Sequence, residues 1–221
     1  RLPTEAVDYS PHQRHNSNVQ WTDSPNAIEA IANPTIVDFL SDLFGDELIC
    51  RSCSLSVSGP GHPGIAIHTD AELYGSPILA RVLYYLDDLT PERSPFKVIP
   101  RSHLSMHRDA NPYHRLLSHP DELMVTCKAG SATIINQMVF HGNFPNHSDS
   151  RRRMFAIAYR PAWSGPIRDL EERDPDKVAT LPQHIQPFFR SINTGHIEYD
   201  LPNRPDGMHR DAVGVSPRRW G

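Results

Sequence analysis

The stretch Gly64-Ile65-Ala66-Ile67-His68-Thr69-Asp70 is a short apolar run that ends on a histidine and an aspartate. It follows the turn-forming residues 58–61, so a strand is expected at Ile65–His68. Residues two apart on a strand face the same side, and His68 and Asp70 can therefore reach one ion. A second apolar segment, Thr133–Gly142, brings His141 to a turn in the same way.

The chain around this stretch, from residue 47 to residue 161, has the pattern of many short strands. Clusters of Gly, Pro, Asn and Asp separate them, and helices of the length found in βαβ units are missing between them. The expected strands are Leu48–Ser58, Ile65–His68, Ala80–Leu86, Phe96–Ile99, Leu123–Cys127, Ala132–Ile135 and Met154–Arg160. This pattern favours a mainly β protein, a double-sheet jelly roll with a few flanking helices.

A helix is expected to begin at Pro34, with Asn33 as its N-cap and Gly45 at its end. Its apolar stripe consists of Ile36, Leu40, Leu43 and Phe44. A shorter helix is expected before it, over Pro25–Ala32.

The two ends of the chain carry weaker signals. Residues 1–23 show no usable pattern, and the absence of an initial methionine indicates a shortened N-terminus. Residues 162–221 are rich in proline and charge, with one helix expected around Gln183–Ser191, and form either a lid or a wrap. The prediction is a single domain over 1–221, with its β core at about 47–161.

Composition excludes several classes of protein. The 221 residues are 38% hydrophobic and 22% charged, as in globular domains. The net charge of −4 does not indicate a basic surface that would bind nucleic acid. No apolar run is long enough for a membrane helix. Three cysteines argue against a disulfide framework and for a reducing, cytoplasmic location. The pair Cys50 and Cys53 is expected on one strand, on opposite faces, with no second pair to complete a zinc site.

With thirteen histidines in the chain, chance matches to H-x-D are common. The segment in which each match lies has to show which one is a metal site. The spacing recurs at His107/Asp109, His147/Asp149 and His209/Asp211. These three lie in polar loops or near the C-terminus, whereas His68 and Asp70 end an apolar strand. Two imidazoles and one carboxylate form the facial triad of non-haem iron(II) oxygenases, so His68, Asp70 and His141 are the predicted metal ligands. The alternative is that both histidines are ordinary polar residues at strand ends.

Three arginines, Arg151, Arg152 and Arg153, lead into the last expected strand. A guanidinium fork suits the distal carboxylate of 2-oxoglutarate. On a strand Arg152 faces opposite to its two neighbours, so alternation allows one inward arginine without choosing it. The alternative is a solvated basic edge.

Together with the segments around them, these residues resemble the phytanoyl-CoA dioxygenase family of Fe(II)/2-oxoglutarate oxygenases, over about residues 34–161. The resemblance rests on four pieces in order, which are Ile67–Asp70, Leu86–Glu92, Val98–His103, and Gly130–Ala132 leading to His141-Gly142 and the arginines.

The resemblance implies a double-stranded β-helix, a cupin-like jelly roll, with iron on His68, Asp70 and His141. It also implies that Arg152 binds 2-oxoglutarate, because the family's arginine usually lies at this position after the distal histidine. Asn143 stands where many relatives have serine, and the family's Pro-Gly-Ser-His turn reads Pro100-Arg101-Ser102-His103, with His103 structural. Thr69, Tyr84 and Tyr85 are further pocket candidates, with Thr69 and Tyr85 assigned to the cosubstrate. For the two tyrosines, burial in the core is the alternative.

The predicted function is therefore oxidation, most simply hydroxylation, of a small organic molecule with O2 and 2-oxoglutarate, releasing succinate and CO2. Asp70 argues against the related halogenases, which replace this carboxylate with a small residue. Two rivals stay open, a cupin-type metalloenzyme that does not use 2-oxoglutarate and a binding protein that has lost catalysis. Substrate identity and oligomeric state are not encoded in any pattern found.

Overall fold

Two antiparallel sheets form the body of the computed structural model, which describes residues 14–18, 25–45, 47–70, 79–104, 113, 115–162 and 174–189. The major sheet has the order β1-β2-β9-β4-β7 and the minor sheet the order β3-β8-β5-β6. The major strands are β1 (Arg14–Asn18), β2 (Leu48–Ser58), β4 (Ala80–Tyr85), β7 (Ala132–Asn136) and β9 (Arg152–Pro161). The minor strands are β3 (Ile65–His68), β5 (Phe96–Val98), β6 (Leu123–Val125) and β8 (His141–Asn143).

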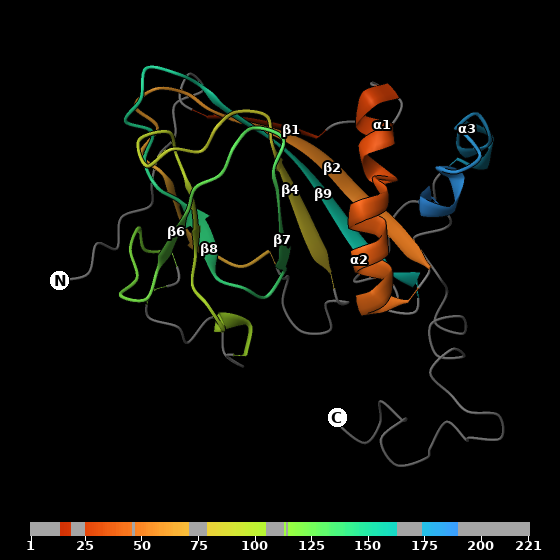
Figure 1. Cartoon of the computed structure of the whole chain (residues 1–221), viewed down its shortest axis with the longest axis horizontal. Coiled ribbons are helices and arrows are strands. Elements are labelled where there is room, and N and C mark those ends of the chain that lie inside the picture. Colours follow the sequence, from red (N-terminus) through yellow and green to blue (C-terminus); the bar gives the residue numbers. More distant parts are fainter. Residues whose placement is uncertain are drawn as a thin grey trace, which may run out of the picture.

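The strand order confirms the expected jelly roll, because neighbours in each sheet are far apart in sequence. In Figure 1 the minor sheet lies across from the inner face of the major sheet, while α1 and α2 lie on the other side. Between the sheets, inner residues of β4 such as Leu83 and Tyr85 pack with Phe96 of β5 and Ala156 of β9.

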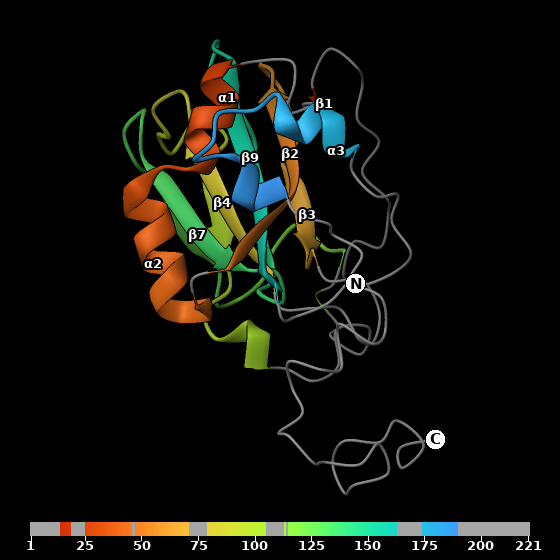
Figure 2. The same ribbon diagram turned by 90° about the vertical axis from the view of Figure 1, so that its right-hand side faces the viewer.

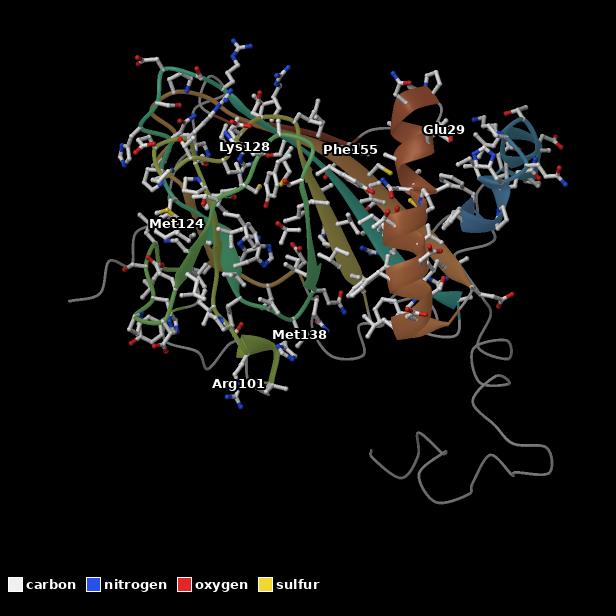
Figure 3. All side chains as sticks on the ribbon, in the orientation of Figure 1. Glu29, Arg101, Met124, Lys128, Met138 and Phe155 are labelled. Atoms are coloured by element: carbon white, nitrogen blue, oxygen red, sulfur yellow. The ribbon has the colours of Figure 1, made fainter. Side chains whose placement is uncertain are left out.

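A second apolar core joins the outer face of the major sheet to the helices. Helix α1 (Pro25–Ile31) and helix α2 (Pro34–Phe44) cover this face, as Figure 2 shows from the side. Alternate residues of β9, Phe155, Ile157 and Tyr159, point into this core, and Figure 3 labels Phe155 beside α1. Strand β9 is therefore buried on both faces.

Helix α2 begins and ends as its sequence predicts. The Asn33 side chain accepts a hydrogen bond from the Thr35 N–H, and Gly45 follows the last turn with φ of 89°. Ile36 and Leu40 are buried, but Leu43 is 60% exposed, so that part of the predicted stripe is wrong. Val37 and Phe44 also pack against the outer core, so the buried face of α2 leaves out only Leu43 of the predicted stripe.

The expectation that Cys50 and Cys53 face opposite ways is also wrong. The pairing of β2 with β9 shifts register between Cys50 and Ser52, which marks a bulge. In β2, even-numbered residues face the helices before the bulge, and odd-numbered residues face them after it. Both thiols consequently lie in the outer core, with their Sγ atoms 3.7 Å apart.

The described part of the C-terminal tail wraps the outer core. Helix α3 (Pro175–Ala179) was not expected, and the helix expected around 183–191 is a short 3-10 helix, η3 (Gln186–Phe189). Ile185 and Phe189 are buried in the outer core. Residues 174–189 therefore do not form a lid over the space between the sheets. Among the described helices, none is long and apolar enough to cross a membrane.

Candidate functional site

Three side chains with metal-binding atoms meet at one end of the jelly roll. His68 ends β3, Asp70 follows it, and His141 begins β8, where the two histidines are paired in register. One donor atom from each lies within 4.8 Å of the others. Asp70 Oδ1 is 3.8 Å from His68 Nε2, and Asp70 Oδ2 is 3.6 Å from His141 Nε2. The structure thus brings the three predicted ligands together.

Both imidazoles are held with the same nitrogen toward the aspartate. His68 Nδ1 lies 2.8 Å from the Ala66 carbonyl, and His141 Nδ1 lies 2.9 Å from the Val139 carbonyl. A carbonyl only accepts, so each Nδ1 carries the proton and each Nε2 keeps its lone pair. This tautomer presents two neutral nitrogen ligands beside one carboxylate, as a divalent metal requires.

Arg81 is a neighbour of the triad that the sequence did not reveal. It lies on the inner face of β4, and its Nε is 2.6 Å from Asp70 Oδ2. The N–H is not aligned with the oxygen, so the contact is an ion pair rather than a directed hydrogen bond. Asp70 therefore faces an arginine of β4 as well as the two histidines.

The turn at residues 100–103 supports the start of β8. Ser102, in the 3-10 helix η1 (Ser102–Leu104), accepts the Phe140 N–H at 2.7 Å and donates to the Ile99 carbonyl. Arg101 stands at φ of 66°, where a glycine is less strained, and Figure 3 shows its side chain pointing away from the body of the molecule. His103 is exposed and lies outside the metal group, as the sequence predicts for a histidine of the turn and not of the metal motif.

The three arginines are sorted by the alternation of β9. Arg152 faces the inside of the jelly roll and is fully buried, whereas the side chains at 151 and 153 are exposed. Arg153 instead binds Asp87 through two nitrogens, at 3.0 and 2.8 Å. The arginine that faces inward is thus the one that the resemblance selects.

Buried polar groups surround Arg152 at the end of the interior where β9 begins. Arg152 Nε donates to the Ser94 carbonyl at 3.3 Å, and Asn143 Nδ2 lies 3.4 Å from the same oxygen. The Tyr85 hydroxyl is buried without an aligned hydrogen-bond partner among the described residues. Burial raises the pKa of Tyr85 to about 12, while nearby Thr133 and the Arg152 charge each lower it. Tyr85 therefore stays protonated, and this end of the interior offers donors suited to an anion.

The other two pocket candidates lie differently. Thr69 is buried between the two ligands of its motif, and its hydroxyl has no hydrogen-bond partner in the described part of the chain. Tyr84 faces the helices, where its hydroxyl donates to the Ala30 carbonyl at 3.1 Å. It lines an apolar cavity of about 380 Å³ beneath α1, on the face opposite to the triad. The expectation that Tyr84 lines the site is therefore wrong, because β4 alternates.

The remaining H-x-D pairs do not form a metal group among the described residues. His147 is exposed in a turn, and the pairs at 107/109 and 209/211 lie outside the described residues. A further pair, His119 and Asp121, has the same spacing, but there the His119 ring accepts the Asp121 N–H at 3.0 Å. This spacing alone does not make a site.

We expect the Asp87 ion pair to make stability depend on pH. Its hydrogen bonds from Arg153, with the Arg93 charge nearby, hold the pKa of Asp87 below its usual range despite partial burial. A lowered folded-state pKa stabilises the fold above the unfolded pKa of about 3.9, and this contribution is lost as pH falls through the folded value.

The variant Asp87→Asn should therefore unfold more easily than wild type at pH 7, by about 1 kcal/mol. Urea denaturation at pH 7, 5 and 3.5 should show the difference shrinking as pH falls. A difference that stays constant over this range would contradict the assignment.

The fold and the ligand set together define a class. Two histidines and one aspartate on a double-sheet jelly roll are characteristic of mononuclear non-haem iron oxygenases. A family model described as phytanoyl-CoA dioxygenase matches residues 5–154. The chain belongs to this family.

Individual relatives agree with the family. Dioxygenase af480 of Aspergillus fumigatus is 26% identical over 179 residues, which are 77% of this chain and 56% of the relative. The chain thus spans a little over half the length of that relative.

Among solved structures, HygX of Streptomyces hygroscopicus, with nickel, 2-oxoglutarate and hygromycin B bound, is 16% identical at a TM-score of 0.60, covering 77% of this chain and 79% of HygX. The 2-oxoglutarate-dependent epimerase SnoN from nogalamycin biosynthesis is 19% identical at a TM-score of 0.59, covering 72% of this chain and 68% of SnoN. These TM-scores show that the chain shares its fold with both structures.

Proposed function

We propose that the chain is a non-haem Fe(II)/2-oxoglutarate-dependent oxygenase that hydroxylates a small organic molecule. The observation that carries the proposal is the convergence of His68 Nε2, His141 Nε2 and the Asp70 carboxylate within 4.8 Å. Membership of the phytanoyl-CoA dioxygenase family supports it. Fe(II) bound there, with O2 and 2-oxoglutarate, supplies the oxidising power for hydroxylation and releases succinate and CO2.

The residues of this chain have separate tasks in that reaction. The two histidines and Asp70 would hold the metal, and three protein ligands would leave coordination positions for the cosubstrate and O2. Arg152 neutralises the far carboxylate of 2-oxoglutarate, and Tyr85 donates a hydrogen bond near it. The apolar inner face of β4 and β9 keeps water from this end of the interior. A role for Thr69 rests only on its position between two ligands.

The substrate remains defined by class. Solved neighbours hold nogalamycin RO or hygromycin B, which supports a small organic substrate here. Because SnoN is an epimerase on the same fold, the fold alone does not fix the reaction. Hydroxylation requires a product that is heavier than the substrate by one oxygen atom, whereas epimerisation leaves the mass unchanged, so mass spectrometry of turned-over substrate separates the two.

Binding of the metal and the cosubstrate can be tested without knowing the substrate. Anaerobic addition of Fe(II) and 2-oxoglutarate to the purified protein should give the weak visible charge-transfer band of the chelate, only when both are present. The variant His68→Ala should lose the band, because it removes one of three ligands. His119→Ala, which alters a histidine of the same H-x-D spacing outside the site, should keep it.

Two results would reject the proposal. A folded wild-type protein that binds iron but gives no band would favour the cupin-type rival. A band of equal strength in His68→Ala would show that the metal binds elsewhere.

A further inference from the structure

Strand β2 lines the interior with a row of serines that the mechanism above does not use. After the bulge at Cys50, its even-numbered residues face inward, opposite to Cys53 and Leu55 in the outer core. Ser54, Ser56 and Ser58 are therefore paired with the inner residues Ala156, Met154 and Arg152 of β9. Buried hydroxyls normally have hydrogen-bond partners, so each serine of the row is considered by itself.

Ser58 differs from the rest of the row. It is fully buried, and its Oγ has no hydrogen-bond partner among the described residues. Ser56 is also buried, but its hydroxyl is not among the unpaired polar atoms. A buried hydroxyl without a partner destabilises the folded protein, so its retention points to a partner that binds later.

The position of Ser58 indicates what that partner is. Ser58 stands directly opposite Arg152 across the β2–β9 pair, and directly opposed residues share a face with their Cβ atoms about 5 Å apart. The Tyr85 hydroxyl, also buried without an aligned partner, lies near the same arginine. A hydroxyl on the residue opposite this buried arginine, together with a protonated phenol near the arginine, makes a set of donors suited to an anion.

Asn143, two positions after His141 on β8, is engaged elsewhere. Asn143 Nδ2 lies 3.4 Å from both the Ser94 and Pro95 carbonyls. Its N–H groups are thereby directed at the backbone before β5. The hydroxyl nearest in register to Arg152 is then that of Ser58.

We infer that Ser58 is a binding residue for the far carboxylate of 2-oxoglutarate, donating its hydroxyl beside Arg152. This inference rests on the proposed function, since it assigns a further contact to the same cosubstrate. It goes beyond that function in naming a residue of β2, a strand that carries no part of the H-x-D…H motif. Ser58 affects only the far carboxylate, and the chelating end of the cosubstrate lies at the metal.

The test combines a change in the protein with the matching change in the ligand. Wild type, Ser58→Ala and the control Ser56→Ala are loaded with Fe(II) without oxygen and titrated with 2-oxoglutarate, following the chelate band. The same titration uses 2-oxopentanoate, which keeps the chelating group and the five-carbon chain but lacks the far carboxylate. Ser58→Cys, which keeps the volume of the side chain but donates weakly, shows whether the hydroxyl or the space matters.

Ser58→Ala should bind 2-oxoglutarate about 10- to 100-fold more weakly, the range for a hydrogen bond to a charged group. Ser58→Ala should bind 2-oxopentanoate as wild type does. Ser58→Cys should behave like Ser58→Ala with both acids. Ser56→Ala should match wild type with both acids. Without ligand, Ser58→Ala should melt at a higher temperature than wild type, because the unpaired hydroxyl is gone.

Unchanged 2-oxoglutarate affinity in Ser58→Ala, or an equal loss for both acids, would overturn the inference while leaving the proposed function in place. No band in wild type with either acid would overturn both.

Discussion

The variant Arg152→Leu is expected to lose 2-oxoglutarate binding while keeping its metal. Arg152 is fully buried and faces the interior, so a carboxylate that meets it there has little water to replace the lost partner. Removing one side of a buried charge pair costs about 2–5 kcal/mol, which weakens binding by about 30-fold to several thousand-fold. Replacing the buried guanidinium by an apolar side chain should leave the fold nearly as stable.

Anaerobic titration of the chelate band measures this loss directly, and binding of Fe(II) alone is the internal check. Arg151→Leu is the matched control, because its side chain is exposed and it directly precedes β9. It should bind both iron and 2-oxoglutarate as wild type does. Full activity of Arg152→Leu would leave that arginine without a task and would support the cupin-type rival.

The second large effect is expected from one methyl group, in Gly142→Ala. A Cβ at position 142 would collide with the Ile65 carbonyl oxygen and lie 3.3 Å from the Ala66 oxygen. Both atoms belong to β3, so relief requires β8 and β3 to move apart. These strands carry His141 and His68, and their separation sets the distance between the two Nε2 atoms.

Gly142→Ala should destabilise the fold by about 1–3 kcal/mol, as overpacking does, and weaken metal binding by about tenfold or more. Gly130→Ala is the control for backbone strain, because Gly130 has φ of 86° but no atom within 4 Å of its would-be Cβ. It should lose about 1 kcal/mol of stability and keep its metal affinity. Co(II) titration with thermal melting measures both, and wild-type metal affinity in Gly142→Ala would refute the argument.

Much of the fold could be predicted from local sequence patterns, and the structure confirms these predictions. The bounds of β2 and β3 agree with the expected strands, and α2 has the N-cap and glycine end that its sequence indicates. Such features depend on a few adjacent residues, so tertiary contacts have little room to overrule them. The expected grouping of His68, Asp70 and His141 followed from the same local reasoning about strand ends.

Other features could not be predicted from the sequence, because they depend on pairing between distant segments. Strand β8 has only three residues, too few to show any alternation, and exists because β3 and β5 pair with it on both sides. The bulge that turns Cys50 and Cys53 to one face is a property of the β2–β9 register. Strand β9 is apolar on both faces, so the pattern could not show which arginine pointed inward.

Arg81 and Ser58 were missed for a related reason. Neither belongs to a motif, and each matters only through the residue that pairing brings beside it. Arg81 meets Asp70 from β4, and Ser58 stands opposite Arg152 from β2.

The shortness of β8 has a further consequence for the proposed enzyme. His141 and Asn143 are the two ends of this strand and face the interior together, with Asn143 sharing the Ser94 carbonyl with Arg152. Two residues of extended chain span about 6.6 Å, which is close to the reach of a stretched five-carbon diacid. If 2-oxoglutarate binds between His141 and Arg152 as proposed, the spacing along β8 matches its chain length. We therefore expect the shorter oxaloacetate and the longer 2-oxoadipate to bind more weakly than 2-oxoglutarate.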